Sequence, residues 1–249
     1  MGRGGETMVK PVLRYGLATV AYWEPRFITP FLDHIPYWVE DVTVLSSTRP
    51  WMGKHKEGDP TADLARKAGA RVIENHWATE AEQRNTGCDM HMDKDWVIIM
   101  DPDEFLDDEG WEKLKEHLET TTEDAVVVEG QNTYWKNGYV ADPARDYKML
   151  IAVRPQVKFV DKRIVGIGYG EAPVWMHHFS WARTDEEIWS KISHYAHAED
   201  FDIKGWYENV WLKWESGVQD VHPVSPETLH DLIPTILPPE LERLSLWPK

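Results

Sequence analysis

Trp96-Val97-Ile98-Ile99-Met100-Asp101-Pro102-Asp103-Glu104 joins an apolar run to two carboxylates spaced two residues apart. An uninterrupted apolar run of this length is typical of a strand buried on both faces, as in a parallel sheet. At the carboxyl end of such a strand, Asp101 and Asp103 would lie at the mouth of the crevice where open α/β sheets bind ligands. Pro102 stiffens the turn that presents them.

Carboxylates in this position suit Mg²⁺ or Mn²⁺, which prefer oxygen ligands and can share the phosphate oxygens of a nucleotide. The pattern therefore predicts a metal-dependent enzyme that handles a nucleotide diphosphate. The alternative is a polar turn that caps the next helix, since Asp107 and Asp108 are also suitable N-caps.

Strand and helix patterns alternate on both sides of this run. Besides Trp96–Met100, strands are predicted at 15–21, 42–45, 71–74 and 125–129. Helices are predicted at 26–38, 61–68, 78–92 and 111–118. This alternation predicts an α/β fold, with a mostly parallel twisted sheet flanked by helices.

The pattern changes after Gly130, where residues 131–146 are polar, aromatic and rich in turn formers. Short antiparallel strands are expected at 149–154, 157–159 and 164–167, a final strand at 174–179, and helices at 185–197 and 204–216. The proline-rich tail is expected to be a wrapped loop with short helices. We predict a catalytic domain over residues 11–183 and a helical C-terminal extension over 184–249, packed on the same domain.

Composition limits the class of protein. The chain has 249 residues, 42% of them hydrophobic, which is enough for a substantial core. A net charge of −16 argues weakly against a nucleic-acid partner, which would demand a basic surface. Cys88 is the single cysteine, so a reducing compartment is permitted. No apolar run approaches the length of about 20 residues that a membrane span needs, and the start has no apolar signal segment, so we expect a soluble cytoplasmic protein.

The 14 tryptophans are an unusual feature of the composition, and several lie late in the chain. Tryptophans are most often part of the core. Their flat faces also stack on sugar rings and bases, so a carbohydrate-binding groove is the second interpretation.

Two segments could hold a nucleotide beside the carboxylates. Thr19-Val20-Ala21-Tyr22-Trp23-Glu24 ends the first strand beside the crevice, where Tyr22 and Glu24 could hold a base and a ribose. A polar helix start, with Glu24 near the positive end of the helix dipole, is equally compatible. Arg84, in Glu82-Gln83-Arg84-Asn85-Thr86-Gly87, could donate two bonds to a diphosphate, or belong to a solvated helix face.

Two later segments add candidates. His177 and His178 are adjacent on an expected strand, so only one of them can face the crevice. We choose His178 as a metal ligand; a buried structural histidine is the alternative. Glu171 lies in the glycine-containing segment Gly168-Tyr169-Gly170-Glu171-Ala172-Pro173 and could be a general base, although a turn between strands would have the same composition.

The order of these pieces resembles a family-2-type glycosyltransferase of the GT-A fold. The loop at Ala21-Tyr22-Trp23-Glu24 is similar to that family's nucleotide-contacting first loop, and 82–87 to its Ala-Arg-Asn-x-Gly helix. Ile99–Phe105 resembles its metal-binding Asp-x-Asp (DXD) motif, and His177 or His178 its late metal-ligand histidine. Leu45-Ser46-Ser47-Thr48-Arg49 departs from the family, which usually has an aspartate there, and only Gly170-Glu171-Ala172 partly matches its Glu-Asp pair.

The resemblance implies a hexosyl or pentosyl transferase that uses a nucleotide-diphosphate sugar. Asp103 and His178 would hold Mn²⁺ or Mg²⁺, with Asp101 contacting the metal through water or holding the ribose. Arg84 would share the diphosphate charge. Glu171 or Glu129 would be the base that activates the acceptor hydroxyl.

On this interpretation Asp103→Ala abolishes metal-dependent turnover and leaves the fold intact. The segment Gln131–Asn137, with Trp175 and Trp181, is expected to shape the acceptor site. The expected acceptor is a glycan or a small metabolite; a modified base in viral DNA is less favoured because of the negative charge.

Two other functions are compatible with parts of the sequence. A metal-dependent nucleotidyltransferase would also use the two carboxylates, but it would favour a glycine-rich basic loop after the first strand, where this chain has Tyr22-Trp23-Glu24-Pro25. A non-catalytic sugar-binding module would account for the tryptophans and leave the carboxylates without a role.

Overall fold

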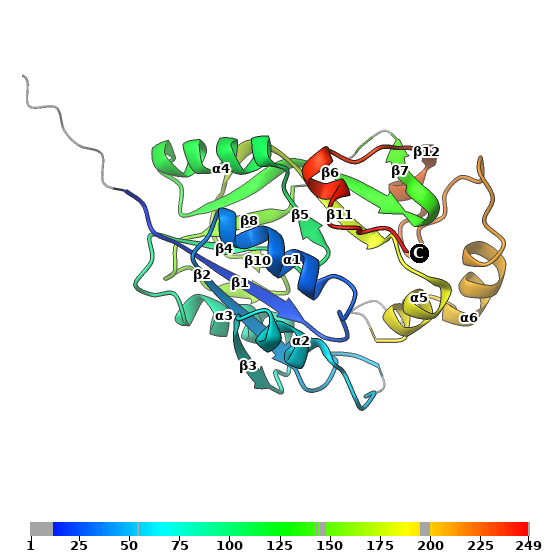
Figure 1. Ribbon diagram of the computed structural model, residues 1–249, viewed down its shortest axis with the longest axis horizontal. Coiled ribbons are helices and arrows are strands. Elements are labelled where there is room, and N and C mark those ends of the chain that lie inside the picture. The colour runs from blue at the N-terminus through cyan, green and yellow to red at the C-terminus, as the bar shows by residue number, and fades with distance from the viewer. Residues whose placement is uncertain (1–11, 54, 143, 145–147, 195–199, 249) are drawn as a thin grey trace, which may run out of the picture.

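The computed structural model describes residues 12–53, 55–142, 144, 148–194 and 200–248. Within these residues a ten-stranded sheet has the order β12-β7-β6-β8-β4-β1-β2-β3, and β11 and β5 pair off this path (Figure 1). The strands of this sheet are β1 (Tyr15–Ala21), β2 (Asp41–Ser47), β3 (Arg71–Asn75), β4 (Trp96–Ile99), β5 (Glu104–Phe105), β6 (Ala125–Trp135), β7 (Tyr139–Asp142), β8 (Leu150–Val153), β11 (Gly170–Trp181) and β12 (Asp231–Pro234). A separate antiparallel pair is formed by β9 (Phe159–Asp161) and β10 (Ile164–Val165).

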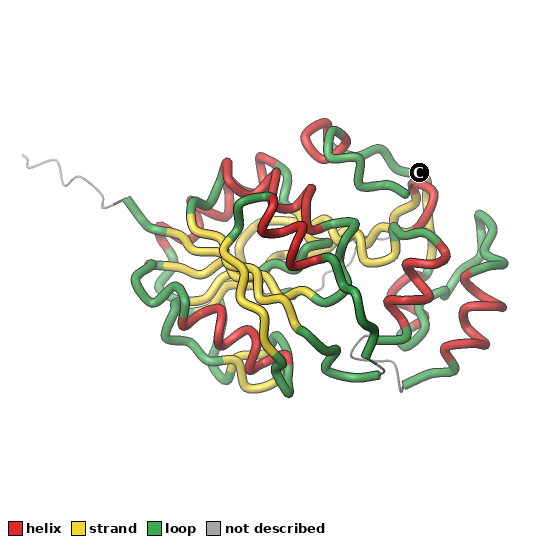
Figure 2. Tube along the Cα trace, turned by 60° about the horizontal axis from the view of Figure 1, so that its bottom comes forward, coloured by secondary structure: helices red, strands yellow, loops and turns green. Residues whose placement is uncertain are grey.

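Helices cover both faces of the sheet (Figure 2). They are α1 (Ile28–His34), α2 (Thr61–Lys67), α3 (Glu80–Asp89), α4 (Asp108–Thr120), α5 (Asp185–Ile192), α6 (Ile203–Trp206) and α7 (Pro239–Glu242). None of the helices within the described residues has the length and apolar character that crossing a bilayer requires.

The parallel half of the sheet follows the sequence prediction. β3, β2, β1 and β4 are parallel neighbours in that order. β1 has the predicted bounds, and every residue of β4 is buried, as an apolar strand covered on both faces requires. The mixed α/β class, with a mostly parallel central sheet and a smaller antiparallel part, is therefore confirmed.

Side chains of β4 alternate between two hydrophobic cores. Trp96 and Ile98 join the core that contains residues of α1 and α4, whereas Val97 and Ile99 join the core that contains residues of α3. Figure 1 shows α1 and α4 on one side of the strands and α3 on the other. This double coverage explains why the sequence of the strand is continuously apolar rather than alternating.

The turn-rich segment 131–146 is strand over most of its length. β6 continues to Trp135, and a 3₁₀ turn at Lys136–Gly138 leads into β7. Tyr134 and Trp135 are buried, while Gln131 and Thr133 line a cavity. Polar side chains directed into that cavity hide the strand pattern in the sequence. Residues 143 and 145–146 lie outside the described residues.

The strand expected at 174–179 is longer and is not the final one. β11 begins at Gly170, so Gly170–Pro173 is strand rather than turn. It runs parallel to β6 and antiparallel to β5.

The C-terminal region is less helical than predicted, because it also contributes β12, which pairs antiparallel with β7. α5 ends at Ile192, a π-helical turn (Tyr207–Trp211) follows α6, and residues 195–197 of the predicted helix lie outside the described residues. Five tryptophans from β6, β11 and this region share one buried cluster: Trp135, Trp181, Trp206, Trp211 and Trp214. The core interpretation therefore holds for these residues.

Candidate active site

A cavity of about 600 Å³ lies at the carboxyl ends of the parallel strands. Its walls come from the ends of β1 and β2, the turn after β4, the second half of β6, the end of β11 and the last turn of α5, with residues 222–225 at one side. Strands that run the same way leave their carboxyl ends at one edge, so this is the expected place for a ligand.

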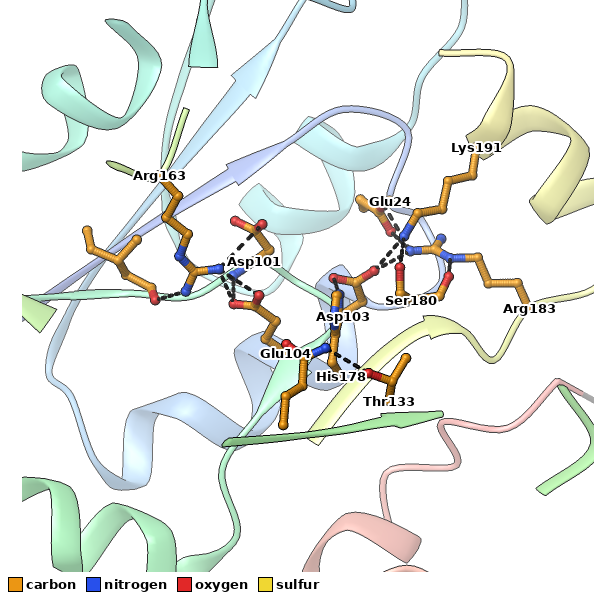
Figure 3. Close-up of polar contacts among 12 residues, drawn as sticks. Glu24, Asp101, Asp103, Glu104, Thr133, Arg163, His178, Ser180, Arg183 and Lys191 are labelled. Atoms are coloured by element: carbon orange, nitrogen blue, oxygen red, sulfur yellow. Dashed lines mark hydrogen bonds and ion pairs between the residues drawn. The ribbon is translucent and has the colours of Figure 1, made fainter. Parts of the chain in front are cut away.

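Asp101 is held by two arginines from distant parts of the chain, Arg84 and Arg163; Figure 3 shows the contact with Arg163. Nη2 of Arg84, on α3, lies 2.9 and 3.1 Å from the two carboxylate oxygens. Nη1 of Arg163, between β9 and β10, lies 3.8 Å from Asp101 and donates to both oxygens of Glu104 at 2.6 and 2.8 Å. Burial alone would lower the pKa of Arg84, but Asp101 and Glu80 raise it overall. The positive charges of Arg84 and Arg163 therefore hold the Asp101 carboxylate in place.

Asp103 is buried among cations at the cavity wall (Figure 3). Its Oδ2 accepts hydrogen bonds from Nη2 of Arg183 at 2.7 Å and from Nζ of Lys191 at 3.0 Å. Its Oδ1 lies 3.6 Å from Nε2 of His178. Burial raises the pKa of Asp103, but Lys191, His178 and Arg183 outweigh it and hold that pKa well below its usual range.

Backbone pairing brings His178 to Asp103. β5 directly follows the Asp-Pro-Asp turn and pairs antiparallel with β11, which sets His178 opposite Glu104. The backbone N–H of Phe179 also donates to the carbonyl oxygen of Asp103 at 2.8 Å. Because side chains alternate, His178 lines the cavity, and His177 points to the other face, where its Nδ1 lies 2.6 Å from Oη of Tyr134.

Glu24 completes a balanced cluster of charges. Its carboxylate accepts from Nη2 of Arg183 at 2.8 and 3.1 Å, so that arginine bridges Glu24 and Asp103. With Lys191, the cluster holds two negative and two positive side chains. Burial raises the pKa of Glu24, and the nearby charge of Asp103 adds to this while Arg183 opposes it.

The loop before Glu24 is held in an uncommon conformation. Trp23 has a φ of +56°, in the left-handed region that non-glycine residues rarely adopt. Its N–H donates to Asp59 Oδ2 at 2.7 Å, and the N–H of Glu24 donates to Thr61 Oγ1 at 2.8 Å. These bonds stabilise the strained turn, and strain of this kind is often found at functional sites.

The structure brings most of the predicted site residues together. Ala21, Tyr22, Glu24, Asp101, Asp103 and His178 all line the cavity. Arg84 acts behind it, through Asp101. Thr19 does not reach the cavity, because it is fully buried within β1. Of the two tryptophans expected at the acceptor site, Trp181 is among the lining residues and Trp175 is not.

The two candidate bases lie outside the residues that line the cavity. Glu171 is at the start of β11, opposite Val127 of β6, and its carboxylate lies 2.7 Å from Nζ of Lys148. His178 is seven positions later, about 20 Å along an extended strand. Glu129 is nearer, since it shares its face of β6 with Gln131 and Thr133, which line the cavity.

Sequence reasoning missed the cations of the site, Arg163, Arg183 and Lys191. Only Arg183 and Lys191 have a local signal. Arg183 directly precedes a helix whose Thr184 and Glu187 form a capping box, and Lys191 lies in the last turn of that helix. Nothing in the sequence indicates that this helix packs beside the Asp-Pro-Asp turn.

The geometry allows two protein ligands for a metal ion at Asp103. Oδ2 of Asp103 and both oxygens of Asp101 are engaged by cations, which leaves Asp103 Oδ1 and His178 Nε2 facing each other. Among the residues that the structure describes, no three His, Cys, Asp or Glu side chains are grouped to hold a metal. A cation here would have to take its other ligands from a substrate and from water.

Comparison with solved structures finds similar chains at low sequence identity. S. aureus TarS 1-349 is 10% identical, with a TM-score of 0.47, over 72% of this chain and 64% of that one. A longer S. aureus TarS structure is 11% identical, with a TM-score of 0.46, over 72% of this chain and 38% of that one. A mycobacterial protein is 19% identical, with a TM-score of 0.36, over 54% of this chain and 46% of that one. This chain therefore spans less than two thirds of each.

No curated protein matches the sequence. The sequence model described as glycosyl transferase family 2 matches residues 57–184, which is just over half of the chain and extends from before α2 to the start of α5. The matched segment contains Arg84, Asp101, Asp103, His178 and Arg183. The chain belongs to glycosyl transferase family 2.

Proposed function

We propose that this chain transfers a sugar from a nucleotide-diphosphate donor, bound in the cavity, to an acceptor hydroxyl. The observation that carries the proposal is the buried cluster at Asp103, where a carboxylate at the cavity wall is surrounded by Arg183, Lys191 and His178. Membership of a glycosyl transferase family supplies the reaction class.

Lys191 is the cation best placed to meet the diphosphate. It lines the cavity and its side chain is 17% exposed, whereas Arg183 is 3% exposed and lies behind Asp103. When the sugar leaves, negative charge grows on the diphosphate, and a preorganised ammonium stabilises that charge. Arg183 and Ser180 hold the cluster in place, since the hydroxyl of Ser180 accepts from Lys191 at 2.9 Å.

Asp103 Oδ1 and His178 Nε2 would hold Mn²⁺ or Mg²⁺, with phosphate oxygens completing the shell. When bound, such an ion supplies further positive charge to the leaving diphosphate. His178 Nδ1 is buried without a hydrogen-bond partner in the described part of the chain, whereas Nε2 lies toward Asp103 Oδ1. Asp101 contributes the orientation of the turn, because Arg84 already occupies both of its oxygens.

The nucleoside would lie at the ends of β1 and β2. Ala21, Tyr22 and Glu24 line this side, together with Ser47 and Arg49, where the resembled family usually has an aspartate. A nucleotide base that contacts a serine and an arginine would form different hydrogen bonds from a base that contacts a carboxylate. The donor base therefore has to be measured.

Glu129 is the better candidate for the base that deprotonates the acceptor. It shares a face of β6 with cavity-lining residues, whereas the carboxylate of Glu171 is paired with Lys148 toward the other end of β11.

A thermal-shift panel tests the proposal. Uridine, guanosine, cytidine and thymidine diphosphates are each added with and without Mn²⁺. A ligand present at 100 times its dissociation constant stabilises the folded state by about 2.7 kcal/mol, which is readily detected. Stabilisation by one diphosphate, increased by Mn²⁺, is the expected result and identifies the donor base. If none of the four changes the melting temperature, the cavity is not a donor site.

A further inference from the structure

A second hollow, of about 780 Å³, adjoins the cavity on the far side of α5. Ser190 and His194 line both spaces. Lys56 connects them as well: its Nζ lies 3.4 Å from Ser190 Oγ in the hollow and 3.7 Å from the centre of the Trp23 ring in the cavity wall. We call this second hollow the α5 groove.

One face of α5 forms a wall of the α5 groove. Glu186, Trp189, Ser190 and Ser193 recur at the three- and four-residue spacing that places side chains on the same side of a helix. Lys191, which follows Ser190, contacts Asp103. Residues two apart on a helix point to roughly opposite sides of it, so Trp189 faces the groove and Lys191 faces the cavity, and the two spaces meet at Ser190 and His194.

An exposed aromatic pair lies in the α5 groove. Trp189 is the most exposed of the 14 tryptophans, at 42%, and its ring centre lies 4.9 Å from that of Tyr207. Tyr207 is fixed by a 3.1 Å hydrogen bond from its hydroxyl to the carbonyl oxygen of Asp185. Within the described residues, the indole N–H of Trp189 has no partner. The Trp189 ring packs against the fixed Tyr207 ring, and its indole N–H is available as a donor. An aromatic face beside a hydrogen-bond donor matches the apolar face and the hydroxyl groups of a sugar ring.

Charges in the α5 groove are balanced. Lys56 and Lys204 are offset by Glu186 and Glu208, and Lys204 lies 3.8 Å from Glu208. A nucleic acid would need a basic surface, and the chain as a whole carries −16. Aromatic faces with balanced charges favour an uncharged ligand that is rich in hydroxyl groups.

We infer that the α5 groove is the acceptor subsite, and that it binds a neutral oligosaccharide with one sugar ring stacked on Trp189. This rests on the proposed donor site in the adjoining cavity. The acceptor hydroxyl would then approach past Ser190 and Lys56. The segment that matches the family model, residues 57–184, contains none of the residues that line this groove.

The test is a titration of the ¹⁵N-labelled full chain followed by NMR of its tryptophan indole N–H signals. The Trp189 signal is identified by its loss in Trp189→Phe. The probes are cellotetraose, laminaritetraose, chitotetraose and mannotetraose, with a ten-nucleotide oligothymidylate for comparison. At least one tetrasaccharide is expected to shift the Trp189 signal, with an affinity unchanged between low and high salt. Trp189→Ala should weaken that binding by about tenfold.

Tyr169→Ala is the matched control, because Tyr169 is 56% exposed and lines neither space. It should bind the tetrasaccharide as the unaltered chain does. Nucleoside-diphosphate stabilisation is measured on all variants. If a diphosphate binds and no tetrasaccharide shifts the Trp189 signal, the acceptor subsite is overturned and the donor site is kept. The same conclusion follows if only the oligothymidylate shifts the Trp189 signal. Loss of diphosphate binding in Trp189→Ala would make the groove part of the donor site and also overturn the inference.

Discussion

Replacing Asp103 with asparagine removes one charge from the cluster and keeps its shape. The carboxylate is buried, with Arg183 at 2.7 Å and Lys191 at 3.0 Å from the same oxygen. In the variant, two cations remain with Glu24 as their only negative partner, so the cluster carries a net charge of +1. Removing one partner from a buried ion pair costs about 3–5 kcal/mol.

We expect the lower end of that cost, because Arg183 keeps its bond to Glu24. For a chain of this size 1 kcal/mol corresponds to about 2–4 °C, so about 3 kcal/mol lowers the melting temperature by about 6–12 °C. The sequence predicts that replacing Asp103 leaves the fold intact; the charge cluster adds the prediction that the folded state is less stable by this amount. Asp63→Asn is the control: Asp63 is an exposed partner of Arg66, and its loss should cost less than about 1 kcal/mol.

The pH dependence of this difference follows from the pKa of Asp103, which is held well below its ordinary value of 3.8. A depressed carboxylate pKa contributes stability that is fully present above the unfolded-state pKa and is lost as the pH falls through the folded-state pKa. The melting temperatures of the two proteins should therefore differ most above about pH 4 and converge at lower pH. A difference that persists unchanged at acid pH would contradict the ion-pair explanation.

The Asp103→Asn variant also distinguishes the contribution of a bound metal ion to diphosphate binding from that of Lys191 and Arg183. Asp103→Asn weakens the proposed metal site while leaving Lys191 and Arg183 in place, so a diphosphate should still stabilise the protein in the absence of metal. We expect that Mn²⁺ no longer increases this stabilisation. An equal Mn²⁺ effect in both proteins, measured by thermal shift with the same diphosphate, would refute Asp103 as a metal ligand.

Four further substitutions address the roles of single residues. Lys191→Met should lower kcat by about 10²-fold with a smaller effect on donor affinity, because the ammonium acts on charge that develops as the sugar leaves; steady-state kinetics check this. Glu129→Gln should lose most turnover, and Glu171→Gln little, with unchanged diphosphate shifts in both; the reverse order would make Glu171 the base. Trp135→Ala should cost about 3–5 kcal/mol in urea unfolding, because Trp135 is fully buried in the tryptophan cluster.

The parallel half of the fold could be predicted because its signals are local. β1 and β4 are short apolar runs, so the sequence predicts β1 with its observed bounds and β4 to within one residue. The second half is harder to predict, because the later part of β6 includes polar residues, Gln131 and Thr133, that line the cavity. A strand that forms part of a polar site does not have the pattern of a core strand.

The acidic side of the site could be predicted, and the basic side could not, for a physical reason. Asp101 and Asp103 share a turn after a strong strand, so their place in the sheet follows from the strand. Arg183 and Lys191 reach Asp103 only because β11 pairs with β5 and continues into α5, a contact between residues 80 and 88 positions apart. Isolated in sequence, an arginine before a helix cap and a lysine in the last turn are ordinary helix-end residues.

This long-range pairing also changes what the two carboxylates can do. An exposed pair of aspartates would attract a divalent cation with its full charge, whereas here Arg84 and Arg163 compensate Asp101 and Lys191 and Arg183 compensate Asp103. A cation at Asp103 would therefore meet little net negative charge from the protein, and its affinity for the free protein should be weak until a diphosphate supplies further oxygen ligands. Calorimetry with Mn²⁺ alone, and then with the diphosphate present, separates these cases: tight binding of Mn²⁺ to the free protein would contradict the charge balance found in the cluster.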